Sequence, residues 1–207
     1  KATEPVDVTG VQEGEVVNYY HEDGTRWNFE TDTISKEANT TTVIIAKKEA
    51  KHTDLGAEKT VINTGTGKDG KFKAGDTVQF TIVVQNLSNH PLVNTVVEET
   101  LANATILPGQ NYEVGEDGKA VIKSMYGGTP QKDYKDGQTV VIHAQYKVTE
   151  DDTVGIKTNT AKVSNSAAGI EAGISADFEI VKPDPITVDP TADATTFAKT
   201  QTTATDA

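Results

Sequence analysis

Residues 76–86 read DTVQFTIVVQN, and residues 138–149 read QTVVIHAQYKVT. Apolar and polar residues alternate along both stretches, which is the period of a β-strand that buries one face. The apolar positions of the first stretch are Val78, Phe80, Ile82 and Val84. Those of the second stretch are Val140, Ile142, Ala144, Tyr146 and Val148. We expect the two apolar faces to meet in the core of a β-sheet protein.

Five further β-rich stretches surround these two, at residues 57–63, 92–101, 119–123, 156–165 and 173–181. Turn signals made of Gly, Asp, Asn and Pro separate them, at 73–76, 89–91, 116–118, 135–137 and 151–155. About seven short strands with this spacing are typical of a β-sandwich. The sequence therefore predicts an all-β fold, with an immunoglobulin-like sandwich over residues 57–182.

The segments on either side of the sandwich differ from it. Residues 15–30, EVVNYYHEDGTRWNFE, predict a β-hairpin around an Asp-Gly turn, and a third strand is expected at 41–49. We therefore expect residues 1–56 to form an N-terminal β-hairpin extension, a small subdomain or part of a preceding domain. Residues 183–207 are rich in Thr, Ala, Asp and Pro and are expected to be a tail or linker.

The composition argues against several classes of partner. The net charge is −12, and Arg26 is the single arginine, so a nucleic acid or an anionic membrane is not expected to bind. Membrane insertion of this stretch is not expected either, because no window offers the roughly 20 apolar residues that span a bilayer. Cysteine is absent, so the chain has no disulfide, thiolate zinc site or cysteine nucleophile.

Three polar residues fall in phase with the inward faces of their strands. Lys59 is in phase with Val61, Asn159 with Ala161, and Glu99 with the apolar residues at 97 and 101. Taken singly, such residues are usually a solvated lysine, a surface acid and an asparagine that caps a strand. Taken together, they predict a lysine, an acid and an amide inside one sandwich, where an unpaired charge costs several kcal/mol.

One reaction accounts for this combination. An apolar site favours neutral groups, so it lowers the pKa of Lys59 and raises that of Glu99. The neutral amine can then attack the side-chain amide carbon of Asn159, while the acid moves protons to the departing ammonia. The product is an isopeptide cross-link between Lys59 and Asn159, with Glu99 as the assisting acid. Glu98 is the alternate candidate for that acid.

The chain also resembles the repeat domains of Gram-positive surface adhesins and pilin shafts, especially those that form fimbrial isopeptide bonds. The motifs that carry the resemblance are Lys59-Thr60-Val61, Ala74-Gly75-Asp76-Thr77-Val78, Phe80-Thr81-Ile82, Asn86, Glu99-Thr100-Leu101 and Asn159-Thr160-Ala161. The resemblance covers residues 57–181. It implies an immunoglobulin-like sandwich, extracellular display and the roles given above for Lys59, Glu99 and Asn159.

The most concentrated aromatic residues are Tyr19, Tyr20, Trp27 and Phe29. On a hairpin they can form a contact surface for a glycan or a protein, or they can pack as a small core against the neighbouring domain. The four histidines lie on separate segments without the spacing of metal ligands, so no metal site is expected.

These observations favour a structural module of a cell-surface or cell-wall protein, such as a stalk, a spacer or a subunit of a pilus or fibre. Its expected partners are neighbouring domains or subunits of the same protein. The alternative is an adhesin domain that binds a host protein or a glycan through the N-terminal aromatics. We do not expect an enzyme, and neither function needs a cofactor.

Overall fold

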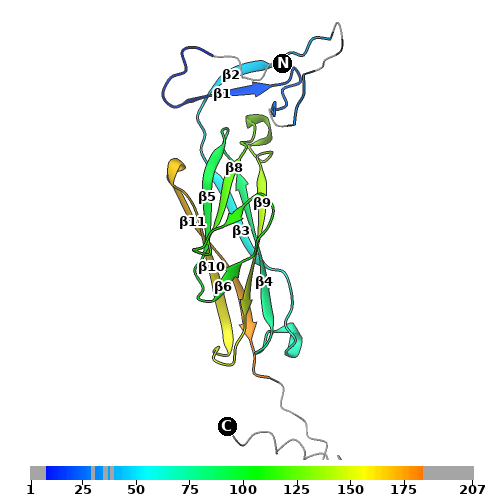
Figure 1. The fold of residues 1–207 in the computed structure, drawn as a ribbon, viewed down its shortest axis with the longest axis vertical. Helices are drawn as coiled ribbons and strands as arrows, with labels where there is room; N and C mark the ends of the chain where they lie inside the picture. Colours follow the sequence, from blue (N-terminus) through cyan, green and yellow to red (C-terminus); the bar gives the residue numbers. More distant parts are fainter. Residues whose placement is uncertain (1–7, 29–30, 35–36, 38–39, 184–207) are drawn as a thin grey trace, which may run out of the picture.

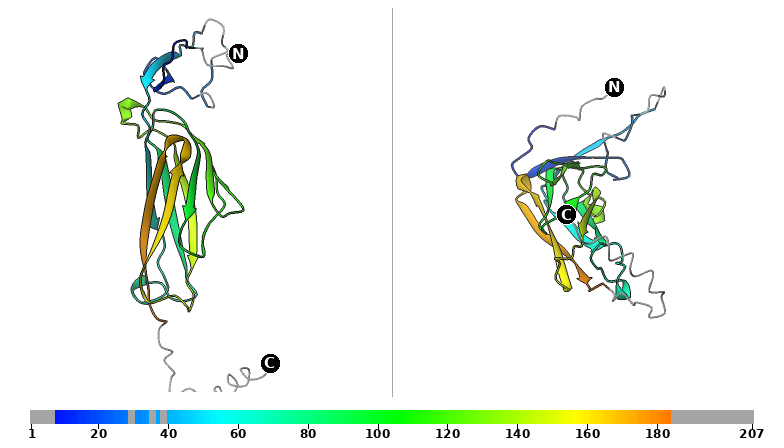
Figure 2. Two further views of the ribbon diagram at one scale, coloured as in Figure 1. Left: turned by 90° about the vertical axis from the view of Figure 1, so that its left-hand side faces the viewer. Right: turned by 60° about the horizontal axis from the view of Figure 1, so that its bottom comes forward.

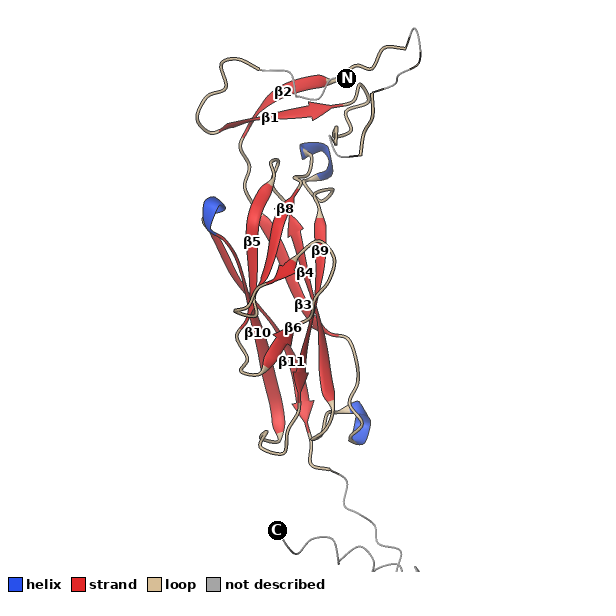
Figure 3. Ribbon diagram, viewed as in Figure 1, coloured by secondary structure: helices blue, strands red, loops and turns tan. Residues whose placement is uncertain are grey.

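The computed structural model describes residues 8–28, 31–34, 37 and 40–183. Its described part holds eleven strands and three short 3-10 turns, η1 (Lys68–Gly70), η2 (Pro130–Lys132) and η3 (Ser166–Ala168). Most strands run along the long axis of a sandwich, and a small two-stranded sheet lies beyond one end of it (Figures 1 and 3). The predicted all-β, immunoglobulin-like sandwich is confirmed. No helix in the described residues is long and apolar enough to cross a membrane.

The larger sheet of the sandwich has five strands in the order β11-β10-β5-β8-β7, with neighbours antiparallel. Their bounds are Ile170–Ile180, Gly155–Asn165, Leu92–Glu99, Ala120–Met125 and Glu113–Val114. The smaller sheet has four antiparallel strands in the order β3-β4-β9-β6. Their bounds are Leu55–Val61, Thr77–Asn86, Thr139–Lys147 and Ala104–Ile106.

The core lies between the two sheets. β4 and β9 are paired neighbours at the centre of the smaller sheet. Their alternating apolar residues face the larger sheet and are buried. The opposing sheet contributes Val97, Ile122, Ala161 and Val163. Each strand of this core places every second side chain inward, as the pleat of a strand requires.

All seven strands predicted for the sandwich are present, with ends that differ by a few residues. The short strands β6 and β7 were not predicted. They hold three and two residues, too few for an alternating pattern to show in the sequence. β6 extends the edge of the smaller sheet by pairing with β9, and β7 extends the larger sheet by pairing with β8.

The N-terminal unit is a two-stranded sheet of β1 (Glu15–Tyr20) and β2 (Ile45–Ala50). The predicted Asp-Gly turn forms, since Asp23 accepts hydrogen bonds from the Thr25 backbone and hydroxyl. The second arm of the predicted hairpin is limited to one bridge between Tyr20 and Arg26. β1 pairs instead along its whole length with β2, which starts at Ile45 rather than at 41.

Asn89 joins this unit to the sandwich. Its buried side chain accepts a hydrogen bond from the His52 backbone at 2.9 Å and donates one to the Ala50 carbonyl at 2.8 Å. Its own carbonyl accepts from Asn18 Nδ2 of β1 at 2.8 Å. The β4–β5 loop therefore binds both the connection before β3 and the small sheet. Figure 2 shows this sheet beyond the end of the sandwich from a second direction.

At the opposite end of the sandwich, Asp152 organises the turn between β9 and β10. It accepts hydrogen bonds from the Tyr146 hydroxyl at 2.5 Å and the Thr149 backbone at 2.8 Å, and it pairs with Lys157. Burial raises the pKa of this carboxyl, but the hydrogen bonds from Lys157, Thr149 and Tyr146 outweigh it and lower the pKa to about 2. The turn is therefore stabilised by the ionised acid.

Asp152→Asn is predicted to destabilise the sandwich at neutral pH by about 1–2 kcal/mol, because the folded pKa lies below the unfolded value. This contribution is fully present above the ordinary pKa of 3.8 and disappears as the pH falls towards 2. Thermal unfolding of both proteins between pH 7 and pH 2 measures it. The exposed Asp133→Asn serves as the matched control. A difference in melting temperature that stays constant down to pH 2 contradicts this role of Asp152.

Candidate functional site

Lys59 lies in the middle of β3 and points into the sandwich, as its phase with Val61 predicts. Its side chain is 0 % exposed, and Nζ lies 2.7 and 2.6 Å from the two carboxylate oxygens of Glu99. The same Nζ lies 4.8 Å from the centre of the Phe80 ring. A lysine of the smaller sheet thus crosses the core to meet an acid of the larger sheet.

The structure places Glu99 rather than Glu98 at this lysine. The Glu99 side chain is 3 % exposed at the end of β5. Glu98 points to the other face of the strand, is 42 % exposed and pairs with Lys119 at 3.1 Å. Adjacent residues of a strand face opposite sides of the sheet, so only one of the two can enter the core.

Asn159 lies inside β10 and is completely buried. Within the part of the chain that the structure describes, both polar atoms of its side-chain amide, Oδ1 and Nδ2, lack a hydrogen-bond partner. Such unsatisfied groups cost about 1–3 kcal/mol each and are rare in folded proteins. The amide of Asn159 therefore lowers the stability of the folded state, and hydrogen bonding does not explain why it is buried.

Two other buried asparagines show how this sandwich normally treats an amide. Asn86 donates to the His90 and Met125 carbonyls and accepts from the Ser88 backbone. Asn165, on the same strand as Asn159, donates to the Val93 carbonyl and to Thr95 and accepts from the Ala168 backbone. Both amides use their donor and acceptor atoms fully, so the unpaired amide of Asn159 stands apart from them.

The strand register brings the acid close to this amide. Glu99 of β5 is paired with Ala161 of β10. Asn159 lies two residues before Ala161 on the same inward face, so it is the diagonal neighbour of Glu99. Diagonal neighbours in an antiparallel pair lie about 7–8 Å apart, within reach of long side chains. Since Lys59 contacts Glu99 directly, the three predicted residues converge on one region of the core.

The electrostatic surroundings favour a reactive amine. Burial lowers the pKa of Lys59, and the hydrogen bond and charge of Glu99 oppose this shift only in part. The buried position of Lys59 therefore favours the neutral amine over the ammonium.

Aromatic rings close the space beside the site. Phe178 of β11 makes edge contacts with Phe72 and Phe80, with ring centres 5.8 Å apart in each pair. Tyr146 packs on the same ring at 5.8 Å. Phe80 in turn covers Lys59 Nζ, so this cluster shields the amine from water on that side.

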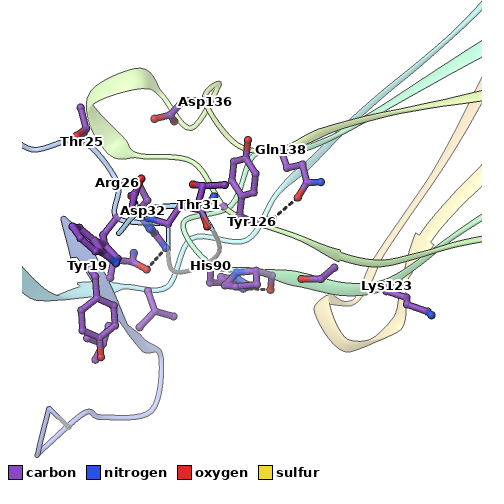
Figure 4. A pocket seen from close by; sticks show the side chains of 18 of the residues that line it. Tyr19, Thr25, Arg26, Thr31, Asp32, His90, Lys123, Tyr126, Asp136 and Gln138 are labelled. Atoms are coloured by element: carbon purple, nitrogen blue, oxygen red, sulfur yellow. Dashed lines mark hydrogen bonds between the residues drawn. The ribbon is translucent and has the colours of Figure 1, made fainter. Parts of the chain in front are cut away.

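The N-terminal aromatics lie elsewhere. Tyr20 and Trp27 are buried, Tyr19 is partly buried, and Phe29 falls outside the described residues. The Tyr20 hydroxyl donates to Glu49 at 2.7 Å, and the Trp27 ring lies 4.6 Å from that of His21. Tyr20 and Trp27 thus pack within the N-terminal unit. Tyr19 and one edge of the unit that includes Trp27 line a cavity beside it (Figure 4).

No protein-family model matches the chain, and no curated protein matches its sequence. Some solved structures are similar to the chain at low identity. An aspartate-to-alanine variant of BcpA, the major pilin subunit of Bacillus cereus, is 13% identical with a TM-score of 0.38, and the match covers 82% of this chain and 64% of that one. The CARDB domain of PF1109 from Pyrococcus furiosus is 14% identical with a TM-score of 0.36, and the match covers 63% and 96%.

A family 123 glycoside hydrolase from Clostridium perfringens is 11% identical with a TM-score of 0.38. That match covers 63% of this chain and only 28% of the hydrolase. A likeness of this extent does not identify a function. The function of the chain is therefore inferred from the residues of its own site.

The charged pair can be tested apart from any covalent chemistry. In an Asn159→Ala background, where no cross-link can form, Lys59→Met is predicted to cost about 3–5 kcal/mol of unfolding free energy, because it leaves Glu99 buried and unpaired. Adding Glu99→Gln should recover most of that loss. Urea unfolding of four proteins, the background, each single variant and the double variant, measures the coupling. Strictly additive effects of the two substitutions contradict a direct buried pair.

Proposed function

We propose that the chain is a structural module of an extracellular surface protein, a spacer or fibre subunit whose sandwich is locked by an isopeptide bond between Lys59 and Asn159. The observation that supports it best is the fully buried amide of Asn159, which has no hydrogen-bond partner among the described residues, although the buried Asn86 and Asn165 are fully paired. An amide held ready for attack accounts for this arrangement.

The reaction follows from the contacts of Glu99. The carboxylate takes a proton from the Lys59 ammonium, which lies 2.6 Å away, and leaves a neutral amine. Nζ attacks Cγ of Asn159 while the protonated acid donates to the amide oxygen. The Nζ–Cγ bond forms and the Cγ–Nδ2 bond breaks. The second proton of Nζ passes through Glu99 to the Nδ2 group, which leaves as ammonia, and the proton on the amide oxygen returns to Glu99. No oxidant, cofactor or external energy source is needed.

Such a bond would supply the covalent support that a chain without cysteine lacks. By the chain-entropy argument, closing a loop of about 100 residues stabilises the folded state by roughly 4–5 kcal/mol. The bond would also join the two sheets, since Lys59 lies on β3 and Asn159 on β10. It would therefore oppose the separation of the sheets directly.

The direction of the chain suits a spacer. β3 begins at the end of the sandwich next to the N-terminal sheet, and β11 ends at the opposite end (Figure 1). Tension applied to the two ends of the domain would pass along the sandwich, and the bond would carry it past the residues between Lys59 and Asn159. Only the segments before Lys59 and after Asn159 would remain free to extend.

The mass of the intact protein tests the bond. The wild-type chain is predicted to be lighter than its sequence mass by about 17 Da, the mass of one ammonia. Lys59→Met, Asn159→Ala and Glu99→Gln should each restore the full mass, the last because glutamine cannot take up the lysine proton. Lys162→Ala, which changes a surface lysine of β10, should keep the loss.

Circular dichroism of the same variants separates a missing bond from a missing fold. A variant that shows the full mass and a wild-type β spectrum has lost the reaction alone. A wild-type protein of full sequence mass overturns the proposed bond, and so does a loss of ammonia that persists in Lys59→Met.

A further inference from the structure

A cavity of about 1190 Å³ lies between the N-terminal unit and the adjacent end of the sandwich. β1 and the turn after it line one side, and residues of the β8 and β9 ends line the other (Figure 4). Arg26, the single arginine of the chain, lines this cavity among the side chains of both units. The proposed cross-link does not involve any of these residues.

The guanidinium of Arg26 is fixed by neutral groups rather than by a direct ion pair. Nη2 donates to Asn18 Oδ1 and, at 3.3 Å, to the Asn89 carbonyl, and the group lies 5.7 Å from the centre of the Tyr20 ring. Arg26 is half-buried, and its Nη1 atom is buried without a hydrogen-bond partner among the described residues. Within those residues no carboxylate lies at ion-pair distance from this arginine, although Glu49 binds the other end of the Asn18 amide. The guanidinium thus has an unused donor and no direct anionic partner.

The acids around the cavity do not fill this role, because each already has a partner. The contacts are Glu15 with the Gln12 backbone, Asp32 with the Asn28 backbone and His21, Glu113 with Lys123, and Asp136 with Thr129. Arg26 is thus held in place by neutral groups, and its guanidinium can form an ion pair with an anion that enters the cavity.

We propose that the cavity binds a sugar that carries a carboxylate, with Arg26 as the residue that receives the carboxylate. A guanidinium fits a carboxylate in a two-pronged, charge-assisted contact. Neutral hydroxyl and amide side chains that suit sugar hydroxyls line the rest of the cavity, at Thr25, Asn28, Thr31, Ser124 and Gln138. Tyr126, which is 49% exposed, offers an aromatic face at its edge.

This combination favours an acidic sugar over an acidic peptide. Peptides are commonly held through main-chain hydrogen bonds to a free strand edge. The lining described here presents side-chain hydroxyls, amides and aromatic rings beside Arg26, while its other cation, Lys123, is paired with Glu113. This set of groups matches a ring of hydroxyls with one acidic substituent. A peptide ligand is therefore an outcome that the experiment must be able to reveal.

The single arginine gives a direct probe, because the full-length chain has only one arginine Nε–H signal in a ¹H–¹⁵N spectrum. Glucuronate and galacturonate are expected to shift this signal in a saturable manner, whereas glucose and galactose leave it unchanged. Acetate and N-acetyl-aspartate, which present a carboxylate without a sugar ring, are expected to bind at least tenfold more weakly. An unchanged Arg26 signal with both acidic sugars overturns the proposal, and so does equal or tighter binding of N-acetyl-aspartate or acetate.

The single tryptophan gives a second and independent readout. Trp27 lines the same cavity, so its fluorescence should follow titration with glucuronate. Arg26→Gln is expected to weaken binding by about tenfold to a hundredfold, the size of one charged hydrogen-bonded contact. Lys119→Gln, which removes a positive charge on the sandwich outside the cavity, should bind like wild type. Equal affinities in the wild type and Arg26→Gln contradict the role of Arg26.

The intact mass of Arg26→Gln separates this proposal from the proposed cross-link. The variant should retain the loss of about 17 Da, because Lys59 and Asn159 lie within the sandwich. Sugar binding without a cross-link, or a cross-link without sugar binding, would each leave one proposal standing and overturn the other.

Discussion

The architecture depends on one constraint, the exclusion of water from the space where the two sheets meet around Lys59 and Glu99. An ion pair in such a place is not a strong source of stability, because removing both charges from water offsets most of their attraction. The unpaired amide of Asn159 adds a further cost. A reaction in the core explains why these destabilising groups are present. The low dielectric that destabilises buried charges also favours the neutral, nucleophilic form of the lysine amine.

The fold was predictable because alternation along β4 and β9 is nearly complete, and a slip by one residue would turn every core side chain outward. The strands β6 and β7 escaped prediction because they are too short to show a period. The pairing of β1 with β2 escaped it for a different reason. An Asp-Gly turn indicates a hairpin locally, but the partner along most of β1 comes from beyond residue 40, and the sequence contains no local signal for that distant pairing.

The inward direction of Lys59 and Asn159 followed from their phase with Val61 and Ala161. The same phase argument favoured Glu99, which is in phase with Val97, over Glu98. The structure places Glu99 at Lys59. That Asn159 lacks hydrogen bonds could only be seen once its neighbours were placed. The same holds for Arg26, which sequence reasoning treated only as a sign of the low content of basic residues. Its contacts with Asn18 and the Asn89 carbonyl depend on how the N-terminal unit meets the β4–β5 loop.

The most direct test of the reactive core is a crystal structure at atomic resolution. If the core is reactive, electron density is continuous between Lys59 Nζ and Asn159 Cγ at an amide bond length of about 1.33 Å, and no density remains for the Asn159 Nδ2 atom. Separate side chains, with the lysine still paired to Glu99 and an intact Asn159 amide hydrogen-bonded to ordered water, would contradict the account.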